Sequence, residues 1–256
     1  MTNIEKAKAL IGTFVSGDVE LAKSLLKEDY IQHNLAYGTG RDAFLGSVAY
    51  LGSAPVKTTL KVVREFEDGD KVILHSVYNF AGMGEQVAFD IFRFEDGLIA
   101  EHWDNLASLT PANPSGRTQI DGIVEIKENG NKEKTLEVVK NFLHDVMQNK
   151  APEKTTSYFN GDSYLQHNSS IADGLSALGA TLAELAKQGI YMIYDKVHYV
   201  LACGDFALAV SEGLFAGKPT TYYDLWRVEN GFIAEHWDVM EEVLPKDKWA
   251  NTNGKF

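Results

Sequence analysis

A fifteen-residue segment of this chain occurs twice, 134 residues apart. Residues 90–104 read DIFRFEDGLIAEHWD and residues 224–238 read DLWRVENGFIAEHWD, with ten of the fifteen positions identical. The same offset relates YIQHN at 30–34 to YLQHN at 164–168. Random apolar patterning would not repeat polar residues at fixed distances. The chain is therefore two copies of one domain, and each copy carries its own set of polar residues.

The length of the chain fits this duplication. With 256 residues, there is room for two domains of about 110 to 130 residues, each with its own core. We expect the first copy at 1–112, a linker at 113–130 and the second copy at 131–256. The linker is rich in Pro and Gly, and its apolar run at 120–126 predicts one extra strand.

In each copy a helical pattern is followed by a strand pattern. Apolar residues at a 3.6-residue spacing predict helices at 4–15, 21–26 and 41–51 in the first copy, and near 132–148 and 174–187 in the second. Runs of β-branched and aromatic residues between turn sequences predict four strands in each copy, near 57–66, 71–80, 86–94 and 98–106, and near 191–200, 205–215, 219–228 and 232–241. Helices followed by an antiparallel meander indicate the α+β class.

Charge and cysteine content limit the partners and the compartment. A formal net charge of −12 argues against nucleic acid or an anionic membrane as partner, because both are bound mainly through Lys and Arg. Cys203 is the single cysteine, so an internal disulfide is excluded and a reducing compartment is favoured. The sequence shows neither a leader pattern nor an apolar run of membrane-spanning length. We expect a soluble, cytoplasmic protein.

The alternation of side chains along strands selects the candidate site. In residues 98–106, alternation places His102 and Asp104 on one face and Glu101 and Trp103 on the other. A carboxylate among large apolar neighbours has a raised pKa and can exchange protons near neutral pH. A His that reaches it from the helical side could share its proton, and the QHN segments supply one in each copy.

The candidate catalytic residues are therefore Asp104, His33, Asp238 and His167. The candidate substrate-binding residues are Asn34, Asp90, His102, His75, Tyr78, Asn168, Asp224 and His236. A purely structural alternative is that Asp104 caps the turn at 32–34. Trp103 and Trp237 are predicted to pack on the outer face of their sheets. Arg93 and Arg227 are predicted to pair with Glu101 and Glu235 across the hairpins.

The sequence offers no established metal or nucleotide motif. His33, His102 and Asp104 contain the ligand types of a two-His-one-carboxylate set, but no HxxxH or CxxC spacing supports such a site. The glycine-rich motifs GxGxxG and GxxxxGK[ST] are also absent. We expect neither a metal nor a cofactor.

The QHN segment and the motif D-x-x-R-x-x-[DN]-G-x-I-x-E-H-W-D resemble the SnoaL-like polyketide cyclases of the nuclear transport factor 2-like superfamily. The resemblance covers roughly 1–112 and 131–244. It implies two cone-shaped domains, each a strongly bent antiparallel sheet wrapped around N-terminal helices (a cystatin-like α+β barrel) with an apolar pocket. It also implies that the copies pack as an internal pseudo-dimer, so that the chain is a monomer or a weak homodimer.

The resemblance assigns a role to the Asp of the HWD segment, which in the cyclases is the general acid/base of an aldol ring closure without metal or cofactor. That role falls on Asp104 and Asp238. Asp90 and Asp224 stand where those cyclases hold His, so the chemistry could differ from aldol closure. We expect a cofactor-independent enzyme that acts on a small hydrophobic carbonyl compound by aldol cyclisation or isomerisation.

Two other functions stay open. One is a non-catalytic ligand-binding or scaffold protein with the same pocket. The other is an epoxide-type hydrolase, which the orientation expected of Arg93 disfavours. We also expect the two pockets to be unequal, because His75 and Tyr78 fall near Val210 and Gly213 of the second copy. We expect any turnover in the first pocket.

Overall fold

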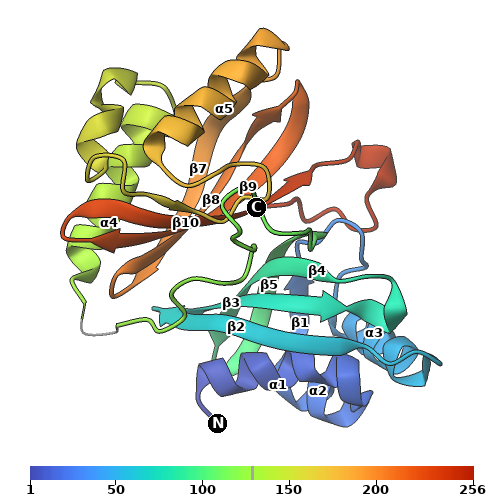
Figure 1. Cartoon of the computed structure of the whole chain (residues 1–256). Helices are drawn as coiled ribbons and strands as arrows, with labels where there is room; N and C mark the ends of the chain where they lie inside the picture. Colours follow the sequence, from blue (N-terminus) through green and yellow to red (C-terminus); the bar gives the residue numbers. More distant parts are fainter. Residues whose placement is uncertain (128–129) are drawn as a thin grey trace. The chain divides into compact units, whose positions relative to one another are not determined.

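The computed structural model describes residues 1–127 and 130–256, and the chain divides into two compact units. Unit 1 comprises Met1–Leu109 and Leu244–Phe256, and unit 2 comprises Thr110–Val243. In each unit, helices pack against a five-stranded sheet that has one parallel and three antiparallel strand pairs (Figure 1). The predicted class, α+β with two domains in one chain, is confirmed.

The units differ from the expected domains in the segments that follow each last strand. Residues 113–130, expected as a linker, belong to unit 2, although 128 and 129 lie outside the described residues. Residues 244–256, expected as the end of the second copy, belong to unit 1. The run at 120–126, expected as a strand, forms none. Asn113 and Asn251 explain these assignments, because their side-chain amides donate to backbone carbonyls of the QHN loops of units 2 and 1.

Three helices of unit 1 begin and end where the sequence requires. α1 (Asn3–Ser16) starts with a capping box between Thr2 and Glu5, and ends at Gly17 with φ of 73°. α2 (Val19–Leu25) is capped by the Asp18 carboxylate, and α3 (Arg41–Ser53) follows Gly40. A Cβ on Gly17 would collide with the backbone of Gly52. These two glycines therefore let α1 and α3 approach closely.

The sheet of unit 1 has the order β1-β5-β4-β3-β2. Its strands are β1 (Leu26–Gln32), β2 (Thr59–Asp68), β3 (Lys71–Asn79), β4 (Gln86–Glu95) and β5 (Leu98–Ser108), with a 3-10 turn η1 (Phe80–Gly82) between β3 and β4. The four strands β2 to β5 are the predicted meander. The sequence did not predict β1, which pairs with β5 in parallel and brings Gln32 opposite His102.

The core of unit 1 lies between the three helices and one face of the sheet. Ala7, Leu10 and Ile11 of α1 share one face at helical spacing and are 2% exposed or less. They pack in one cluster with alternate residues of the strands, among them Leu74 and Phe92. The same sheet face continues into Asp90 and Asp104, so the core and the polar candidates share one side of the sheet.

Unit 2 repeats this plan with the sheet order β6-β10-β9-β8-β7. Its helices are α4 (Lys132–Phe142), continued by a π turn η2 (Leu143–Met147), the 3-10 helix η3 (Pro152–Tyr158) and α5 (Leu175–Lys187). Its strands are β6 (Leu165–Gln166), β7 (Met192–Cys203), β8 (Phe206–Phe215), β9 (Lys218–Glu229) and β10 (Phe232–Glu242). A last 3-10 turn, η4 (Lys246–Lys248), lies in the segment that completes unit 1.

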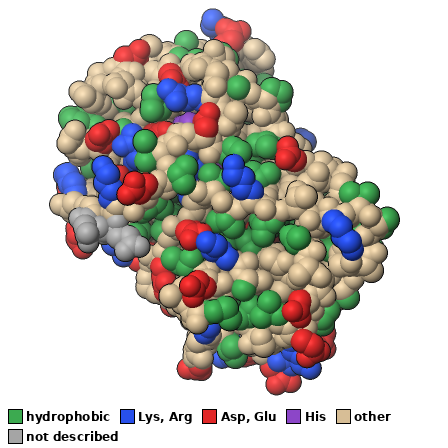
Figure 2. All heavy atoms as spheres, turned by 60° about the horizontal axis from the view of Figure 1, so that its bottom comes forward, with side chains coloured by type: hydrophobic (Ala, Val, Ile, Leu, Met, Phe, Trp, Pro, Cys, Tyr) green, Lys and Arg blue, Asp and Glu red, His purple; other side chains and the backbone are tan. Residues whose placement is uncertain are grey.

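The surface carries mixed charges. On the face shown in Figure 2, Asp and Glu side chains are interspersed with Lys and Arg side chains and with hydrophobic ones. In the described part of the chain, no helix is both long and apolar enough to cross a membrane.

Candidate functional site

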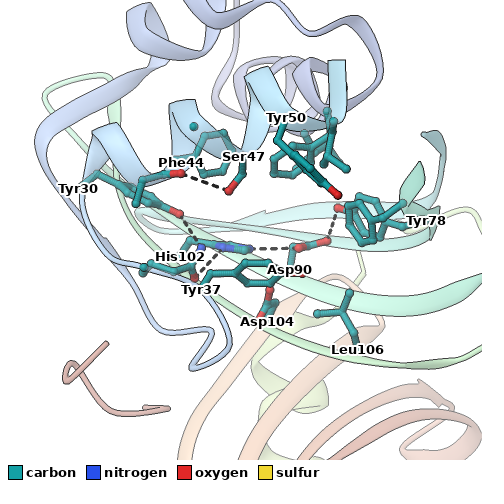
Figure 3. A pocket seen from close by; sticks show the side chains of 18 of the residues that line it. Tyr30, Tyr37, Phe44, Ser47, Tyr50, Tyr78, Asp90, His102, Asp104 and Leu106 are labelled. Atoms are coloured by element: carbon teal, nitrogen blue, oxygen red, sulfur yellow. Dashed lines mark hydrogen bonds and ion pairs between the residues drawn. The ribbon is translucent and has the colours of Figure 1, made fainter. Parts of the chain in front are cut away.

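Unit 1 contains a cavity of about 360 Å³ between its helices and the inner face of its sheet (Figure 3). Ligand pockets of small molecules usually measure about 300 to 1,000 Å³ and combine apolar walls with a few polar groups. The apolar wall includes Phe14 and Phe44 from the helices and Phe92 from β4. The polar residues that line the cavity are Tyr30, Gln32, Ser47, Tyr78, Asp90, His102 and Asp104.

Asp90 and Asp104 lie directly opposite one another on β4 and β5. Alternation turns both carboxyl groups to the cavity side, where they are 4% and 6% exposed. Burial raises the pKa of Asp90, because the charged form loses hydration, and the nearby charge of Asp104 adds to this; hydrogen bonds from His102 and Tyr78 oppose it. The pair can therefore hold a proton that an exposed Asp would release.

The Gln32 amide fixes the tautomer of His102. Gln32 Oε1 accepts a hydrogen bond from the backbone N–H of Asn34 at 2.9 Å, so this atom is the amide oxygen. His102 Nδ1, 3.2 Å from the same oxygen, must then carry a proton. His102 Nε2 lies 3.1 Å from Asp90 Oδ1, and these two atoms share a second proton. Tyr78 donates its hydroxyl to Asp90 Oδ2 at 2.7 Å.

Asp104 is held on one side only. Asn34 Oδ1 accepts from the backbone N–H of Ala36, which orients the Asn34 Nδ2 amino group toward Asp104 Oδ2 at 3.0 Å. Among the described residues, Asp104 Oδ1 has no hydrogen-bond partner. Its nearest ionic neighbour is the Lys255 ammonium at 3.8 Å. The turn-capping alternative therefore accounts for Oδ2 alone, and the Asp104 side chain also lines the cavity.

The prediction that His33 and His167 share the pocket with the carboxylates is wrong. His33 follows Gln32, so alternation turns it to the outer face of the sheet, where it stacks on Trp103 at 4.8 Å between ring centroids. Its Nδ1 donates to Gly254 O, and its Nε2 lies 2.8 Å from Glu101 Oε1. The imidazole of the cavity is His102 instead.

His167 occupies the same outer position in unit 2. Its ring stacks on Trp237 at 4.6 Å, and its Nε2 lies 2.9 Å from Glu235 Oε1. Burial alone would raise the pKa of Glu235, but hydrogen bonds from His167 and Arg227 outweigh it and lower that pKa. These histidines stabilise the outer face of each sheet.

The predicted arginine pairs are confirmed. Arg93 Nε donates to Glu101 at 2.7 Å and Arg227 Nε donates to Glu235 at 2.8 Å. Both pairs lie on the face opposite the cavities. Arg93 is therefore not available to Asp90 and Asp104, and the geometry does not favour the hydrolase alternative.

His75 and Tyr78, both predicted to bind substrate, separate to opposite faces of β3. Tyr78 lines the cavity, but His75 lies three positions earlier and points to the other side. There its ring stacks on Phe89 at 4.3 Å and its Nδ1 lies 3.1 Å from Arg64 Nη1. The assignment of His75 to the pocket is therefore wrong, for the same reason of alternation that applies to His33.

Unit 2 contains a cavity of about 420 Å³ with the same polar arrangement. Asp224 and Asp238 face one another on β9 and β10. His236 Nε2 lies 3.0 Å from Asp224 Oδ1, and its Nδ1 lies 3.0 Å from Gln166 Oε1. Burial raises the pKa of Asp238; the charges of His236 and Asp224 then act in opposite directions, His236 to lower it and Asp224 to raise it. Asn168 Nδ2 donates to Asp238 Oδ2 at 2.7 Å.

Several pocket residues escaped the sequence analysis. Tyr30 and Gln32 belong to β1, which had not been predicted, and their counterparts Tyr164 and Gln166 adjoin or form β6. The repeated spacing Y-x-Q-x-N was the available signal, because residues two apart on a strand share a face. Tyr194 of β7 was also missed. It donates to Asp224 at 3.1 Å, but no Tyr occupies the matching position of the first copy.

The two polar clusters have donor sets that could hold a metal ion. One atom from each of Asp90, His102 and Asp104 lies within 4.8 Å of the others, and the same is true of Asp224, His236 and Asp238. His33 is not part of the first set, which corrects the combination considered from the sequence. In unit 1 the Lys255 ammonium already supplies a positive charge beside Asp104.

Comparison with known proteins identifies the domain type. Residues 7–102 match the model of the SnoaL-like domain. The chain therefore carries a SnoaL-like domain in unit 1, and the predicted family is confirmed there. Comparison with curated proteins found no match.

Similar solved structures correspond to one copy of the repeat. An NTF2-like protein of unknown function from Cytophaga hutchinsonii is 18% identical, with 42% of this chain and 91% of that chain covered and a TM-score of 0.37. IdmH, a polyketide cyclase candidate from Streptomyces antibioticus, is 23% identical, with 41% and 92% covered and a TM-score of 0.36. A ketosteroid isomerase candidate from Kribbella flavida is 21% identical, with 48% and 90% covered and a TM-score of 0.36.

Proposed function

Taking unit 1 as a SnoaL-like domain, we propose that it is an enzyme that moves protons on a small hydrophobic carbonyl compound. The reaction class is aldol cyclisation or isomerisation. A single observation carries the proposal. The buried Asp104 carboxyl group, whose Oδ1 has no hydrogen-bond partner among the described residues, lines an apolar cavity beside the proton shared by Asp90 and His102. One atom of each of the three residues lies within 4.8 Å of the others.

This separation suits a base and an acid that act on neighbouring atoms of one substrate. Asp104 takes a proton from the carbon next to the carbonyl group, and the C–H electron pair moves into the developing enolate. The Asp90–His102 pair gives its proton to the carbonyl oxygen, so the enol leaves no net charge on the substrate. General acid–base catalysis of this kind contributes about 10²- to 10⁴-fold in rate.

The residues around this triad hold the two groups in their roles. Gln32 keeps Nδ1 of His102 protonated, so that Nε2 is the atom that exchanges protons with Asp90. Tyr78 binds the other oxygen of Asp90. The enol can then attack a second carbonyl group of the same molecule, which is aldol closure, or regain a proton at another carbon, which is isomerisation. In both cases Asp104 returns the proton that it took, to the new alkoxide or to the other carbon. As the carbonyl group forms again, the enol O–H returns its proton to the Asp90–His102 pair.

The apolar walls favour a substrate without charge. Phe14, Phe44 and Phe92 line the cavity, and aromatic faces bury large apolar areas of a bound ring. An anionic substrate would face two carboxyl groups. The volume of about 360 Å³ suits a compound of one to three rings at the lower end of the usual range of ligand pockets.

Deuterium exchange tests this function directly. Small cyclic and aromatic ketones are incubated with the protein in D₂O, and incorporation of deuterium next to the carbonyl is followed by NMR. We expect exchange with the wild-type chain and a loss of at least about 100-fold in Asp104→Asn. Asp96→Asn, a matched change at an exposed turn residue, should exchange like wild type. A ketone that binds, by thermal shift, but exchanges no faster than in buffer would favour the ligand-binding alternative.

A further inference from the structure

The segment 244–256 forms part of the wall behind the first pocket. Asn251 Nδ2 donates to the carbonyls of Asn34 and Tyr37, and Asn253 Nδ2 donates to the carbonyl of Gln32. Gly254 O accepts from the His33 ring. These hydrogen bonds tie the segment to the loop whose Gln and Asn side chains orient His102 and Asp104.

Lys255 is buried at this place. The residue is 4% exposed, and its Nζ donates to the backbone carbonyl of Asp104 at 2.8 Å. The same Nζ lies 3.8 Å from Asp104 Oδ1, the buried oxygen that has no hydrogen-bond partner among the described residues. A buried ammonium at this distance favours a negative charge on the carboxylate, because screening by water is weak there.

In unit 2, a side-chain amide holds the matching segment to the QHN loop in the same way, but the ion pair of that segment differs. Asn113 Nδ2 donates to the carbonyls of Gln166 and Ile171, which matches Asn251 in unit 1. Further along the segment, Arg117 takes the place of Asn253, because the two donate to the equivalent residues Asp173 and Thr39. Thr118 O takes the place of Gly254 O as the acceptor from the outer histidine, so Gln119 stands where unit 1 has Lys255. The Arg117 guanidinium donates to Asp173 at 2.7 and 2.8 Å.

One loop position supports this correspondence. Asp173 accepts from the backbone N–H of Gln166, and Thr39 accepts in the same way from that of Gln32. The two positions are thus equivalent. The residue that follows the acceptor of the outer histidine is therefore the cationic Lys255 in unit 1 and the neutral Gln119 in unit 2.

A charge count gives the consequence. The first pocket holds two carboxyl groups, one imidazole and the Lys255 ammonium, so one shared proton on the Asp90–His102 pair makes it neutral. The second pocket holds two carboxyl groups and one imidazole, so a further proton is needed for neutrality. Burial of net charge is costly. In agreement, the pKa of Asp238 is raised, mainly by burial.

We propose that Lys255 is a positioning residue of the first pocket, which keeps Asp104 negative and leaves the shared proton on Asp90 and His102. The proposal rests on the proposed function only where Asp104 is named as the base. The titratable and charged groups that surround Asp104 are Asp90 on β4, His102 on β5, Tyr30 on β1, Tyr78 on β3 and Lys255.

The experiment is an acid titration of the full chain labelled with ¹³C at the Asp carboxyl carbons. Asp90→Asn and Asp104→Asn assign the two signals. In the wild-type chain, the Asp90 signal should change to the protonated form at higher pH than the Asp104 signal. In Lys255→Met, the Asp104 transition should move to higher pH by at least about one unit, a tenfold change in proton affinity. Lys255→Arg should restore the wild-type order.

Two further variants keep the test independent of folding defects. Lys255→Gln places in unit 1 the amide that Gln119 supplies in unit 2, so the Asp104 transition should again move to higher pH. Arg117→Met removes a cation of the matching segment in unit 2 and should leave the Asp104 transition unchanged. Identical Asp104 transitions in wild type, Lys255→Met and Lys255→Gln would overturn the proposal. Turnover is not measured here, so an inactive protein that shows these shifts would contradict the proposed function alone.

Discussion

The two pockets keep one hydrogen-bond network with a tyrosine that comes from different strands. In unit 1, Tyr78 on β3 pairs with Leu60 on β2, whereas in unit 2 Tyr194 on β7 pairs with Gly213 on β8. The tyrosine has thus moved to the neighbouring strand of the pair. Both hydroxyl groups nevertheless donate to the equivalent Asp, which is Asp90 on β4 and Asp224 on β9. A side chain at Gly213 would collide with the backbone of Ile193. The place of the hydroxyl group in space is common to both copies, and its place in the sequence is not.

The pockets differ more in charge than in size. Their volumes are about 360 and 420 Å³. The carboxylate of Asp104 has a buried ammonium 3.8 Å away, whereas unit 2 has the neutral Gln119 at the position of Lys255. Two cavities with the same residues at their centre can therefore hold their protons on different groups. This comparison leads to the predictions below.

The largest expected effect is a difference in deuterium exchange rate between variants of His102, which lines the cavity, and of His33, which lies on the outer face of the sheet. His102→Gln removes the group that shares a proton with Asp90, and should lower the deuterium exchange rate by about 100-fold or more. His33→Gln changes the opposite face and should alter the rate by less than about twofold. Exchange rates of the two variants, measured with one ketone under the same conditions, check this. Equal losses would place His33 back in the mechanism.

The next effect compares the outer histidines with one another. His167 and Glu235 are fully buried, whereas the Glu101 side chain beside His33 is 16% exposed. His167→Ala should lower the free energy of unfolding by about 3 kcal/mol, since a buried charge loses a partner, and His33→Ala by about half as much. Urea unfolding curves of both variants give the comparison. A smaller loss for His167→Ala than for His33→Ala would contradict the structural role argued for this face.

The displaced tyrosines should contribute equally to stability. Tyr78→Phe and Tyr194→Phe each remove one hydrogen bond to a carboxyl group, worth about 1.5 kcal/mol. Burial raises the pKa of both tyrosines far above the usual value, so each hydroxyl stays protonated as a donor. Urea unfolding at neutral pH measures both changes. A loss in one variant alone would show that the two hydroxyl groups are not equivalent.

The smallest effect is a pH dependence of stability. The folded pKa values of Asp90 and Asp238 are raised by burial, so their contribution to stability is complete below the unfolded value of about 3.9 and is lost as pH rises through the folded value. Asp238→Asn removes this loss. Relative to wild type, the variant should gain roughly 1 kcal/mol in free energy of unfolding between pH 4 and pH 7. A parallel pH profile of variant and wild type would contradict a raised pKa.

Much of the fold followed from local patterns in the sequence. The predicted strands of the first copy match β2 to β5 closely, because alternation and turn sequences depend on neighbouring residues alone. Two short edge strands, β1 and β6, were missed because they pair in parallel with distant strands. The exchange of segments 110–127 and 244–256 between the units was missed for a similar reason. It depends on hydrogen bonds such as that from Asn251 to the Asn34 carbonyl, 217 residues apart.

The candidate site was predicted in part. The strand residues Asp90, His102 and Asp104 were identified correctly as neighbours, because the hairpin fixes their register. The QHN segment was located correctly but its orientation was reversed, since the expected His points outward and the Gln and Asn point inward. Alternation along Y-x-Q-x-N would have given the right face. Lys255 could not be found by pattern, because it lies 151 residues from Asp104 in the sequence.

The central claim is that proton transfer takes place in the pocket of unit 1. The most direct measurement compares deuterium exchange of one ketone by Asp104→Asn and by Asp238→Asn. The account predicts that Asp238→Asn keeps most of the wild-type rate and that Asp104→Asn is at least about 100-fold slower, a difference on the order of 2.7 kcal/mol in transition-state stabilisation. Equal rates in the two variants would contradict it, because the pockets would then contribute alike or not at all.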